Sequence, residues 1–279
     1  MEYEFSPVNT DSNSLKEIAT LLRVAFPKST QFNEKFLEWE YRDNPDGKIV
    51  GYNAIYNGLL VAHYVLQPMS ANINGKTEKG LLSLNTATHP LHQGKKLFTK
   101  LAEKSYDLAK SKAYTFVVGV ANANSTHGFI NKLGFQLVGK LDAKIGMGNI
   151  SRIKNIQTEY ERIWNDTNLK WRISNPENVY KIKNNFIMAS AHMMGIEAIL
   201  IEFEKANTLL QSQKSFNPQP LKLWIGIDHS LDWKKSFYFD IPNKLRPSPL
   251  NFIFKDLTNA NRKLNYESVK FSAIDFDAY

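Results

Sequence analysis

Two apolar segments joined by an Asn-Gly pair constrain the fold of this chain most strongly. Residues Ile49–Tyr56 and Leu59–Leu66 are rich in β-branched and aromatic side chains, and Asn57-Gly58 connects them. Both connecting residues tolerate positive φ, which a two-residue hairpin turn requires. The pattern therefore predicts an antiparallel pair of strands in the first quarter of the chain.

Helical and extended patterns alternate around this hairpin. Apolar residues recur at helical spacing, with capping residues before them, in four segments: Asn13–Phe26, Asn33–Tyr41, Phe98–Ser111 and Asn122–Lys132. Further strands are expected over Lys79–Thr88, after a turn at Asn74-Gly75, and over Tyr114–Val120. This order predicts an α/β fold with a mixed sheet, antiparallel in its front half and parallel in its back half.

Composition places the chain among globular proteins. With 279 residues, 43% hydrophobic and 22% charged, it can form two domains of about 140 residues each. The absence of cysteine excludes disulfides, thiolate metal sites and cysteine nucleophiles, and it fits a reducing cytoplasm. We expect no signal peptide, and no membrane span in Phe186–Phe203, because His192, Gly195 and Glu197 interrupt its apolar residues.

The chain is basic, with a formal charge of +8 and an isoelectric point of about 9.3. Such a charge suits an anionic partner: a nucleic acid, an anionic membrane surface or a phosphorylated ligand. A general richness in lysine would have the same effect without any binding face. No basic run is long enough for a nucleic-acid-binding arm, so nucleic acid is not among the expected partners.

Two loops carry the functional signal. The first, Gln93-Gly94-Lys95-Lys96, lies between a predicted strand and a predicted helix, and the second runs from Asn122 to Lys132-Leu133-Gly134-Phe135. With the element order, they resemble the GNAT superfamily of coenzyme A-dependent N-acyltransferases over roughly residues 10–145. Gln93 matches the first position of the family's loop motif, whereas Lys96 and Phe98 replace its two small residues.

The resemblance implies an acyl-coenzyme A site at these loops. A loop that opens a helix offers free backbone N–H groups to a pyrophosphate, and Lys95 and Lys96 add charge, although they could also simply solvate a helix start. Asn124 would bind the pantetheine arm and Phe129 would flank it. The implied cofactor-binding residues are Thr86, Ala87, Thr88, Gln93, Gly94, Lys95, Lys96, Leu97, Phe98, Asn122, Asn124, Ser125 and Phe129.

Catalytic groups common in the family are missing at their usual places. Many relatives carry a glutamate on the strand that corresponds to Leu82–Thr88 and a tyrosine acid where this chain has Ile130. We therefore expect His63 as a base, with a half-buried structural histidine as the alternative, Asn85 to position the amine or a water, and His127 as an acid. No ligand spacing predicts a metal site.

Residues 151–279 echo the first half. The segment Trp39–Pro45 precedes a strand hairpin, and the similar segment Trp171–Pro176 precedes apolar strands around Met194-Gly195. The alternative is that the two segments are similar by chance. We predict a GNAT acyl-coenzyme A domain over residues 1–150 and a degenerate GNAT-like α/β domain over 151–279, which contributes to the acceptor site without a second cofactor loop. We expect a helix that begins near Ser151 to connect the two domains. Strands are expected over Leu223–Ile227, Phe237–Asp240, Leu250–Phe254 and Val269–Phe276.

The tandem layout resembles, more narrowly, sugar N-acyltransferases that acylate a nucleotide-linked amino deoxyhexose for a surface polysaccharide. The resemblance implies a cytoplasmic bacterial enzyme that transfers acetyl or a short hydroxyacyl such as 3-hydroxybutanoyl, with Tyr41, Arg42, Asp275 and Asp277 at the substrate. An acyltransferase for a peptide or protein amine, and a non-catalytic module that binds coenzyme A or nucleic acid, remain as alternatives. The oligomeric state is not predicted.

Overall fold

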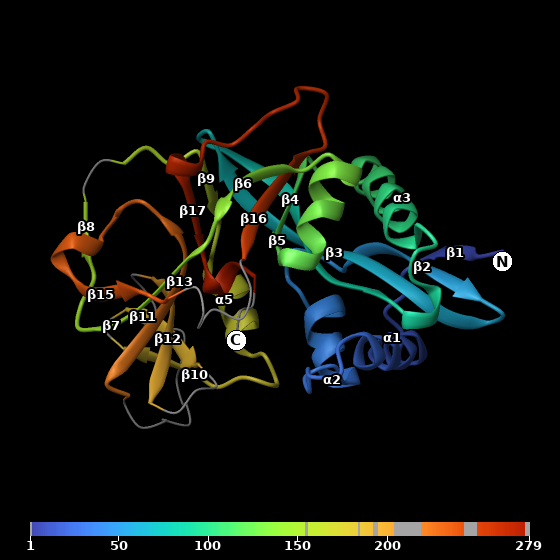
Figure 1. Cartoon of the computed structure of the whole chain (residues 1–279), viewed down its shortest axis with the longest axis horizontal. Helices are drawn as coiled ribbons and strands as arrows, with labels where there is room; N and C mark the ends of the chain where they lie inside the picture. Colours follow the sequence, from blue (N-terminus) through green and yellow to red (C-terminus); the bar gives the residue numbers. More distant parts are fainter. Residues whose placement is uncertain are drawn as a thin grey trace.

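A computed structural model describes residues 2–153, 156–183, 185–191, 195–203, 219–242 and 250–276. Its strands form one large mixed sheet that runs through both halves of the chain, and a separate two-stranded sheet of β8 and β14 (Figure 1). The elements up to residue 147 are β1 Glu4–Pro7, α1 Ser12–Ala25, α2 Glu34–Leu37, π-helix η1 Glu38–Arg42, β2 Val50–Tyr56, β3 Leu59–Ile73, β4 Lys76–Thr88, η2 Pro90–His92, α3 Leu97–Ser111, β5 Phe116–Ala121, α4 Ala123–His127, π-helix η3 Gly128–Lys132, β6 Gln136–Lys140 and β7 Asp142–Met147.

The later elements are shorter and mostly extended. They are β8 Ser151–Arg152, β9 Tyr160–Arg162, α5 Asp166–Ile173, β10 Tyr180–Lys183, β11 Phe186–Ser190, β12 Ile196–Glu202, β13 Leu221–Asp228, β14 Leu231–Asp232, η4 Trp233–Lys235, β15 Phe237–Asp240, β16 Asn251–Asp256, η6 Tyr266–Ser268, β17 Val269–Ser272 and η7 Ala273–Asp275. No helix among the described residues is long and apolar enough to cross a membrane.

The predicted hairpins and the mixed α/β class are confirmed. Asn57 and Gly58 have φ values of 50° and 76°, and Asn74 and Gly75 have 50° and 80°, so both turns use the left-handed region that this residue pair favours. The first turn pairs β2 with β3, and the second pairs β3 with β4, in antiparallel register.

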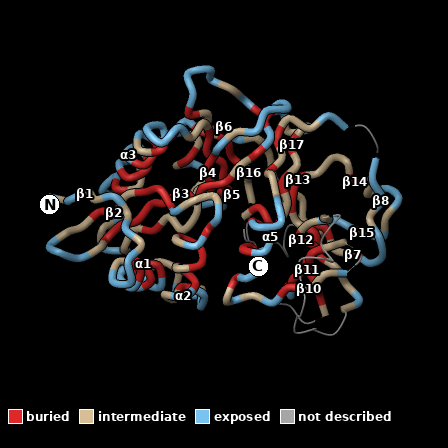
Figure 2. The backbone as a smooth tube through the Cα atoms, turned by 180° about the vertical axis from the view of Figure 1, so that it is seen from behind, coloured by how far each residue is buried: buried red, intermediate tan, exposed pale blue. Residues whose placement is uncertain are grey.

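Helices cover both faces of the first half of the sheet (Figure 1). The α1 helix starts at Asp11, whose carboxylate accepts hydrogen bonds from the N–H groups of Asn13 and Ser14, and it buries Leu15, Ile18 and Leu22. The α3 helix packs on the opposite face. Figure 2 shows the resulting core, with buried residues concentrated along β3, β4 and β5.

The strands β4 and β5 are parallel neighbours for only four residue pairs. Gly80–Ser83 of β4 pair with Phe116–Gly119 of β5, and no described strand pairs with the same edge of β4 beyond Ser83. On its other edge β4 stays paired with β3 as far as Thr88. The carboxyl-terminal part of β4 therefore presents one unpaired backbone edge.

The two halves exchange a strand. From the second half, β16 inserts between β5 and β6, antiparallel to both. In return, β7 of the first half lies between β13 and β15. Each exchanged strand pairs with strands on the other side of the predicted boundary at residue 150. Each half of the sheet therefore contains a strand from the other half of the chain.

The second half repeats the strand order of the first. The strands β10, β11 and β12 are antiparallel neighbours, and β12 runs parallel to β13, as β2, β3, β4 and β5 do in the first half. The parallel pairing again stops after four residue pairs, at Ile199 and Trp224. The predicted GNAT-like architecture with a second α/β unit is thus the observed fold.

Two details of the sequence prediction were wrong. The chain after Ser151 is a short strand followed by β9 rather than a bridging helix, because Tyr160 and Arg162 alternate with Glu161 as a strand between β3 and β17. The last strand ends at Ser272, where Asp275 caps a 3-10 turn. Residues 204–218 and Arg246–Pro249 lie outside the described residues, and the lack of a second cofactor loop in the second half stays a prediction.

We predict that the exchanged strand β16 is essential for the stability of the first half. Phe254 is 1% exposed and stacks on Phe116 of β5. Phe254→Ala should therefore reduce the free energy of unfolding by about 3–5 kcal/mol, measured by urea denaturation. Leu137→Ala on β6, where the side chain is 49% exposed, is the control and should cost less than about 1 kcal/mol. Equal costs would show that β16 does not belong to this core.

Candidate functional site

A cleft of about 330 Å³ lies where the unpaired end of β4 meets the start of α3. Its wall on the sheet side is Thr86, Ala87 and Thr88. The opposite side comes from the loop before α3 and the first residues of that helix. The cleft thus brings together most of the predicted cofactor-binding residues, and the full lining is Thr86, Ala87, Thr88, His92, Gln93, Gly94, Lys96, Leu97, Phe98, Thr99 and Lys132.

The loop is built to present backbone donors. Gly94 and Lys96 have φ values of 74° and 60°, and Lys96 is the N-cap of α3 without a side-chain cap bond. The first N–H groups of α3 have no intrahelical acceptor, and no acidic side chain lies in its first turn. An exposed loop that opens a 15-residue helix in this way is a suitable anion site.

Lysine side chains add positive charge to this loop. Lys96 and Lys132 both line the cleft, whereas Lys95 is exposed next to it and is not part of the lining. Lys132 lies at the end of η3 and was not among the residues predicted from the sequence. The signal that could have indicated it is the Lys-Leu-Gly-Phe ending of the second loop, which contains this lysine.

The cofactor-binding residues predicted in the second loop, Asn122, Asn124, Ser125 and Phe129, do not line the cleft, although Lys132 near the end of this loop does. Asn122 is the N-cap of α4 and accepts hydrogen bonds from the N–H groups of Asn124 and Ser125. The side chains of Asn124 and His127 are exposed. Phe129 is buried, with its ring 5.2 Å from that of Phe98, so it packs against a residue that lines the cleft.

A strained residue marks the middle of the unpaired strand end. Between the pairs His63–Ala87 and Val65–Leu84, Asn85 and Thr86 of β4 lie opposite only Tyr64 of β3, which is a β-bulge, and Asn85 has a φ of 45°. The Asn85 amide donates to Glu40 Oε2 at 2.5 Å and to the Tyr41 hydroxyl at 3.2 Å. Irregular backbone held by buried polar contacts is typical of functional sites.

The hydrogen bonds continue inward from Tyr41 to His63. His63 is fully buried, with Nε2 3.1 Å from the Tyr41 hydroxyl and Nδ1 2.7 Å from Asn53 Oδ1. Since Oδ1 only accepts, Nδ1 carries the proton and the Tyr41 hydroxyl donates to Nε2. Burial lowers the pKa of His63 from 6.5 to about 3, so the ring is neutral at physiological pH. As a base, His63 would reach a substrate only through Tyr41.

Glu40 is a buried carboxylate residue beside the bulge that was not among the predicted site residues. It is 5% exposed and lies in η1, where Asp43 N–H bonds to Glu38 O, five residues back. Glu40 lies four residues after Phe36 and three after Leu37, so helical spacing places it on the same buried face as these two side chains.

Arg42 and Tyr41, two residues predicted to bind the substrate, differ in their exposure to solvent. Arg42 is half-buried and forms ion pairs with Asp43 at 2.9 Å and Glu38 at 3.0 Å, and these contacts raise its pKa. Tyr41, its neighbour, is fully buried. Burial, and then the charge of Glu40, raises the pKa of Tyr41 well above its ordinary value.

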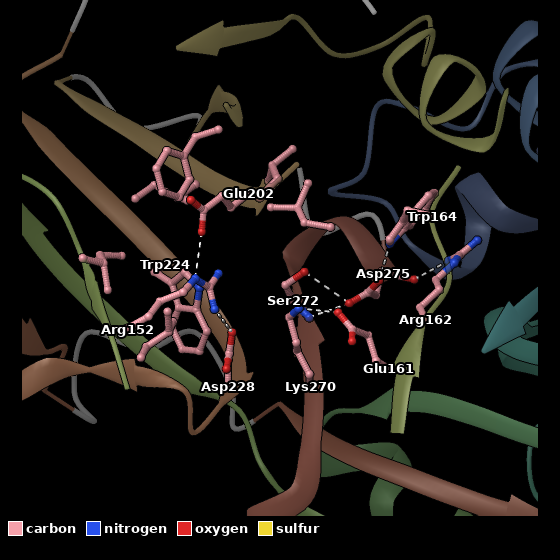
Figure 3. A pocket seen from close by; sticks show the side chains of 16 residues that line it. Arg152, Glu161, Arg162, Trp164, Glu202, Trp224, Asp228, Lys270, Ser272 and Asp275 are labelled. Atoms are coloured by element: carbon pink, nitrogen blue, oxygen red, sulfur yellow. Dashed lines mark hydrogen bonds and ion pairs between the residues drawn. The ribbon is translucent and has the colours of Figure 1, made fainter. Parts of the chain in front are cut away.

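Asp275 lines a separate pocket in the second half (Figure 3). Its carboxylate accepts hydrogen bonds from Trp164 Nε1 at 2.8 Å and from Ser272 N at 2.6 Å, and Arg162 donates to its backbone oxygen at 2.8 Å. Burial raises the pKa of Asp275. This pocket shares no lining residue with the cleft, and Asp277 lies outside the described residues.

In the described part of the chain, no three His, Cys, Asp or Glu side chains are arranged to hold a metal ion. The polar groups that are hydrogen-bonded to one another around the Asn85 bulge include an asparagine, a tyrosine, a histidine and the Glu40 carboxylate. This set can bind and orient an amine and accept a proton.

Comparison with known proteins agrees with this geometry. The acetyltransferase (GNAT) domain family matches residues 8–138. A probable N-acyltransferase from Enterococcus faecalis V583 has 12% sequence identity and a TM-score of 0.59, and the match covers 92% of this chain and 73% of that one. A GCN5-related N-acetyltransferase from Anabaena variabilis ATCC 29413 has 11% identity and a TM-score of 0.58, over 91% of this chain and 73% of that one.

A eukaryotic enzyme shares the fold of both halves. The N-myristoyltransferase of Saccharomyces cerevisiae with bound myristoyl-CoA has 11% identity and a TM-score of 0.57, and the match covers 94% of this chain and 83% of that one. No curated protein sequence matches this chain. At these identities the solved structures show the fold alone.

Residues 8–138 thus carry an acetyltransferase domain of the GNAT type. The chain is a coenzyme A-dependent N-acyltransferase, as the two loops and the element order predicted. The cofactor of this class is acyl-coenzyme A. The residues that line the cleft fit it, because they combine free amides, lysines and an unpaired strand edge.

We predict that coenzyme A affinity depends on the conformation at Gly94. A valine there would be strained at a φ of 74° and would crowd a ligand at the loop amides, so Gly94→Val should weaken binding tenfold or more, about 1.4 kcal/mol per factor of ten. Calorimetric titration with coenzyme A measures this. Gly75→Val is the matched control, since Gly75 has a φ of 80° in a distant turn. Equal affinities of the two variants would contradict a site at this loop.

We also predict that buried His63 makes the protein less stable as the pH falls. The unfolded chain takes up a proton near pH 6.5, whereas the folded chain does so only near pH 3, so stability is lost as the pH falls through this window. Between pH 7 and pH 5 the loss from this group is about 2 kcal/mol. Unfolding of wild type and His63→Gln at both pH values measures it, and the same pH dependence in both proteins would contradict the burial of a neutral ring.

Proposed function

We propose that the chain transfers an acyl group from coenzyme A to the amino group of a nucleotide-linked amino deoxyhexose. The observation that carries this proposal is the cleft itself, with an anion-binding loop at one end and the strained Asn85 centre beside the other. The acyl group proposed is acetyl or a short hydroxyacyl such as 3-hydroxybutanoyl. The product would enter a surface polysaccharide, and the reaction would take place in the cytoplasm of a bacterium.

The acyl donor, acyl-coenzyme A, would lie along the carboxyl-terminal end of β4. Its pyrophosphate would accept hydrogen bonds from the amides at Gly94–Phe98, with Lys95, Lys96 and Lys132 nearby. Pantetheine would then take the place of a neighbouring strand along Leu84–Thr88. The backbone groups on this unpaired edge can bind the pantetheine amides and polarise the thioester carbonyl.

The acceptor amine would approach from the side of α2 and η1. Asn85 would orient the amine or a water there, and the neighbouring Tyr41 and Arg42 belong to the segment that resembles sugar N-acyltransferases. An amine on a sugar ring is partly unprotonated at neutral pH, which favours attack on the thioester. Positioning of the two reactants by the fixed strand end would supply much of the rate.

The second half would complete the acceptor site. We propose the division 1–150 for the acyl-coenzyme A domain and 151–279 for the second, GNAT-like domain, with β7 and β16 exchanged between them. Asp275 and Asp277, predicted for the sugar substrate, belong to this second unit. His127 is proposed as an acid for the departing thiolate, and Asn122, Asn124, Ser125 and Phe129 as supports of the coenzyme A site.

The proposed substrate class predicts a specific acceptor preference. Incubation of the protein with acetyl-coenzyme A and a panel of amino-sugar nucleotides should release free thiol, which a colorimetric thiol reagent measures. The controls are free amino sugars without a nucleotide and short peptides with a free amine. Faster thiol release with a peptide than with every sugar nucleotide would overturn the sugar substrate and favour the peptide alternative.

A further inference from the structure

A single carboxylate, that of Glu40, lies beside the bulge in β4. Glu40 Oε2 is 2.5 Å from the Asn85 amide nitrogen, and Asn85 immediately precedes the three residues that line the cleft. The carboxylate is 95% buried, since Glu40 is 5% exposed. A buried carboxylate is costly, so its position next to the cleft needs an explanation.

Two elements with irregular backbone meet at this contact. Glu40 lies in the π turn of η1, and Asn85, with a positive φ, lies in the β-bulge of β4. Each irregularity costs conformational free energy relative to regular structure.

A chain of hydrogen bonds connects the backbone at Glu40 to β3 and α5. From β3, Gln67 Nε2 donates to the Glu40 backbone oxygen at 3.2 Å, and Gln67 Oε1 accepts from Arg172 of α5 at 3.3 Å. The Tyr41 hydroxyl donates to His63, which is neutral. Tyr41 and His63 both keep their protonation states through the neutral pH range.

We propose that Glu40 is the proton acceptor of the reaction and that Asn85 holds its carboxylate at the acceptor amine. This inference rests on the proposed N-acyl transfer, but not on the sugar nucleotide as the acceptor. It assigns the base to η1 rather than to the strand β4 or to His63. The proton reaches Oε1 or Oε2 directly or through one water.

The step balances in protons and electrons. The lone pair of the neutral amine forms the C–N bond at the thioester carbonyl carbon, and the carbonyl π electrons move to oxygen. As they return, the C–S bond breaks and its electron pair leaves with the coenzyme A thiolate. Glu40 takes the proton that the nitrogen loses and returns it to water, and the thiolate takes one proton from water.

The test compares Glu40→Gln with Glu34→Gln at the start of α2. The glutamine keeps the shape of Glu40 and its contact with Asn85 but cannot accept the proton. With the best amine of the wild type, kcat of E40Q should fall by about 10²–10⁴-fold, with the Kd for acetyl-coenzyme A unchanged and the low-pH limb of the kcat/KM profile lost. E34Q removes the charge of a half-buried carboxylate, which forms an ion pair with Lys16 at 3.8 Å, and should retain wild-type values.

Two further outcomes separate this inference from the proposed function. If wild type acylates peptides or simple amines but no sugar nucleotide, the sugar proposal fails, and the variants are compared with the accepted amine. If wild type acylates a sugar nucleotide and E40Q keeps kcat within threefold and the same pH profile, Glu40 is not the base. Should E40Q unfold, Glu40→Asp replaces it: retained pH dependence with lower kcat supports the inference, and unchanged kcat overturns it.

Discussion

The end of pairing between β4 and β5 at Ser83 and Gly119 is the feature on which the site depends. Two parallel strands that separate leave backbone donors and acceptors without partners, and such groups must be satisfied by water or by a ligand. Because β3 keeps β4 paired on its other edge to Thr88, the free edge is rigid. A cofactor with two amides in an extended arm can occupy it as a strand would.

The strand β16, from the second half of the chain, helps to keep β4 and β5 apart beyond Ser83. With β16 seated against β5, that strand has its own partner and does not return toward β4. The exchange of β16 and β7 also means that neither half is a complete unit by itself. The matches to solved structures extend over more than nine-tenths of the chain, whereas the acetyltransferase domain family matches residues 8–138.

A reciprocal tryptophan contact fixes the segment that carries Glu40. Trp39 Nε1 donates to the Trp171 backbone oxygen at 2.7 Å, Trp171 Nε1 donates to the Trp39 backbone oxygen at 2.9 Å, and the rings stack 5.1 Å apart. Trp39 begins the segment Trp39–Pro45, and Trp171 begins the similar segment Trp171–Pro176. The second half therefore stabilises η1, and with it the polar centre at Asn85, from a distance.

Much of this arrangement could be predicted from local sequence signals. The Asn-Gly pairs fix the hairpins, the cap at Asp11 fixes the start of α1, and the Gln93–Phe98 loop marks the cleft. The π turn at Glu38–Arg42 and the strand exchange could not be predicted, because both depend on contacts between residues far apart in the chain. For the same reason His63 looks like an available base in the sequence, whereas in the fold it is sealed between Tyr41 and Asn53.

The central claim is that acyl-coenzyme A occupies the free edge of β4, and a crystal structure of the protein with bound coenzyme A tests it most directly. The account predicts one cofactor per chain, with its pyrophosphate within hydrogen-bond distance of the amides at Gly94–Phe98 and its pantetheine alongside Thr86–Thr88. Coenzyme A bound instead in the second half, at the pocket lined by Trp224 and Asp275, would contradict it.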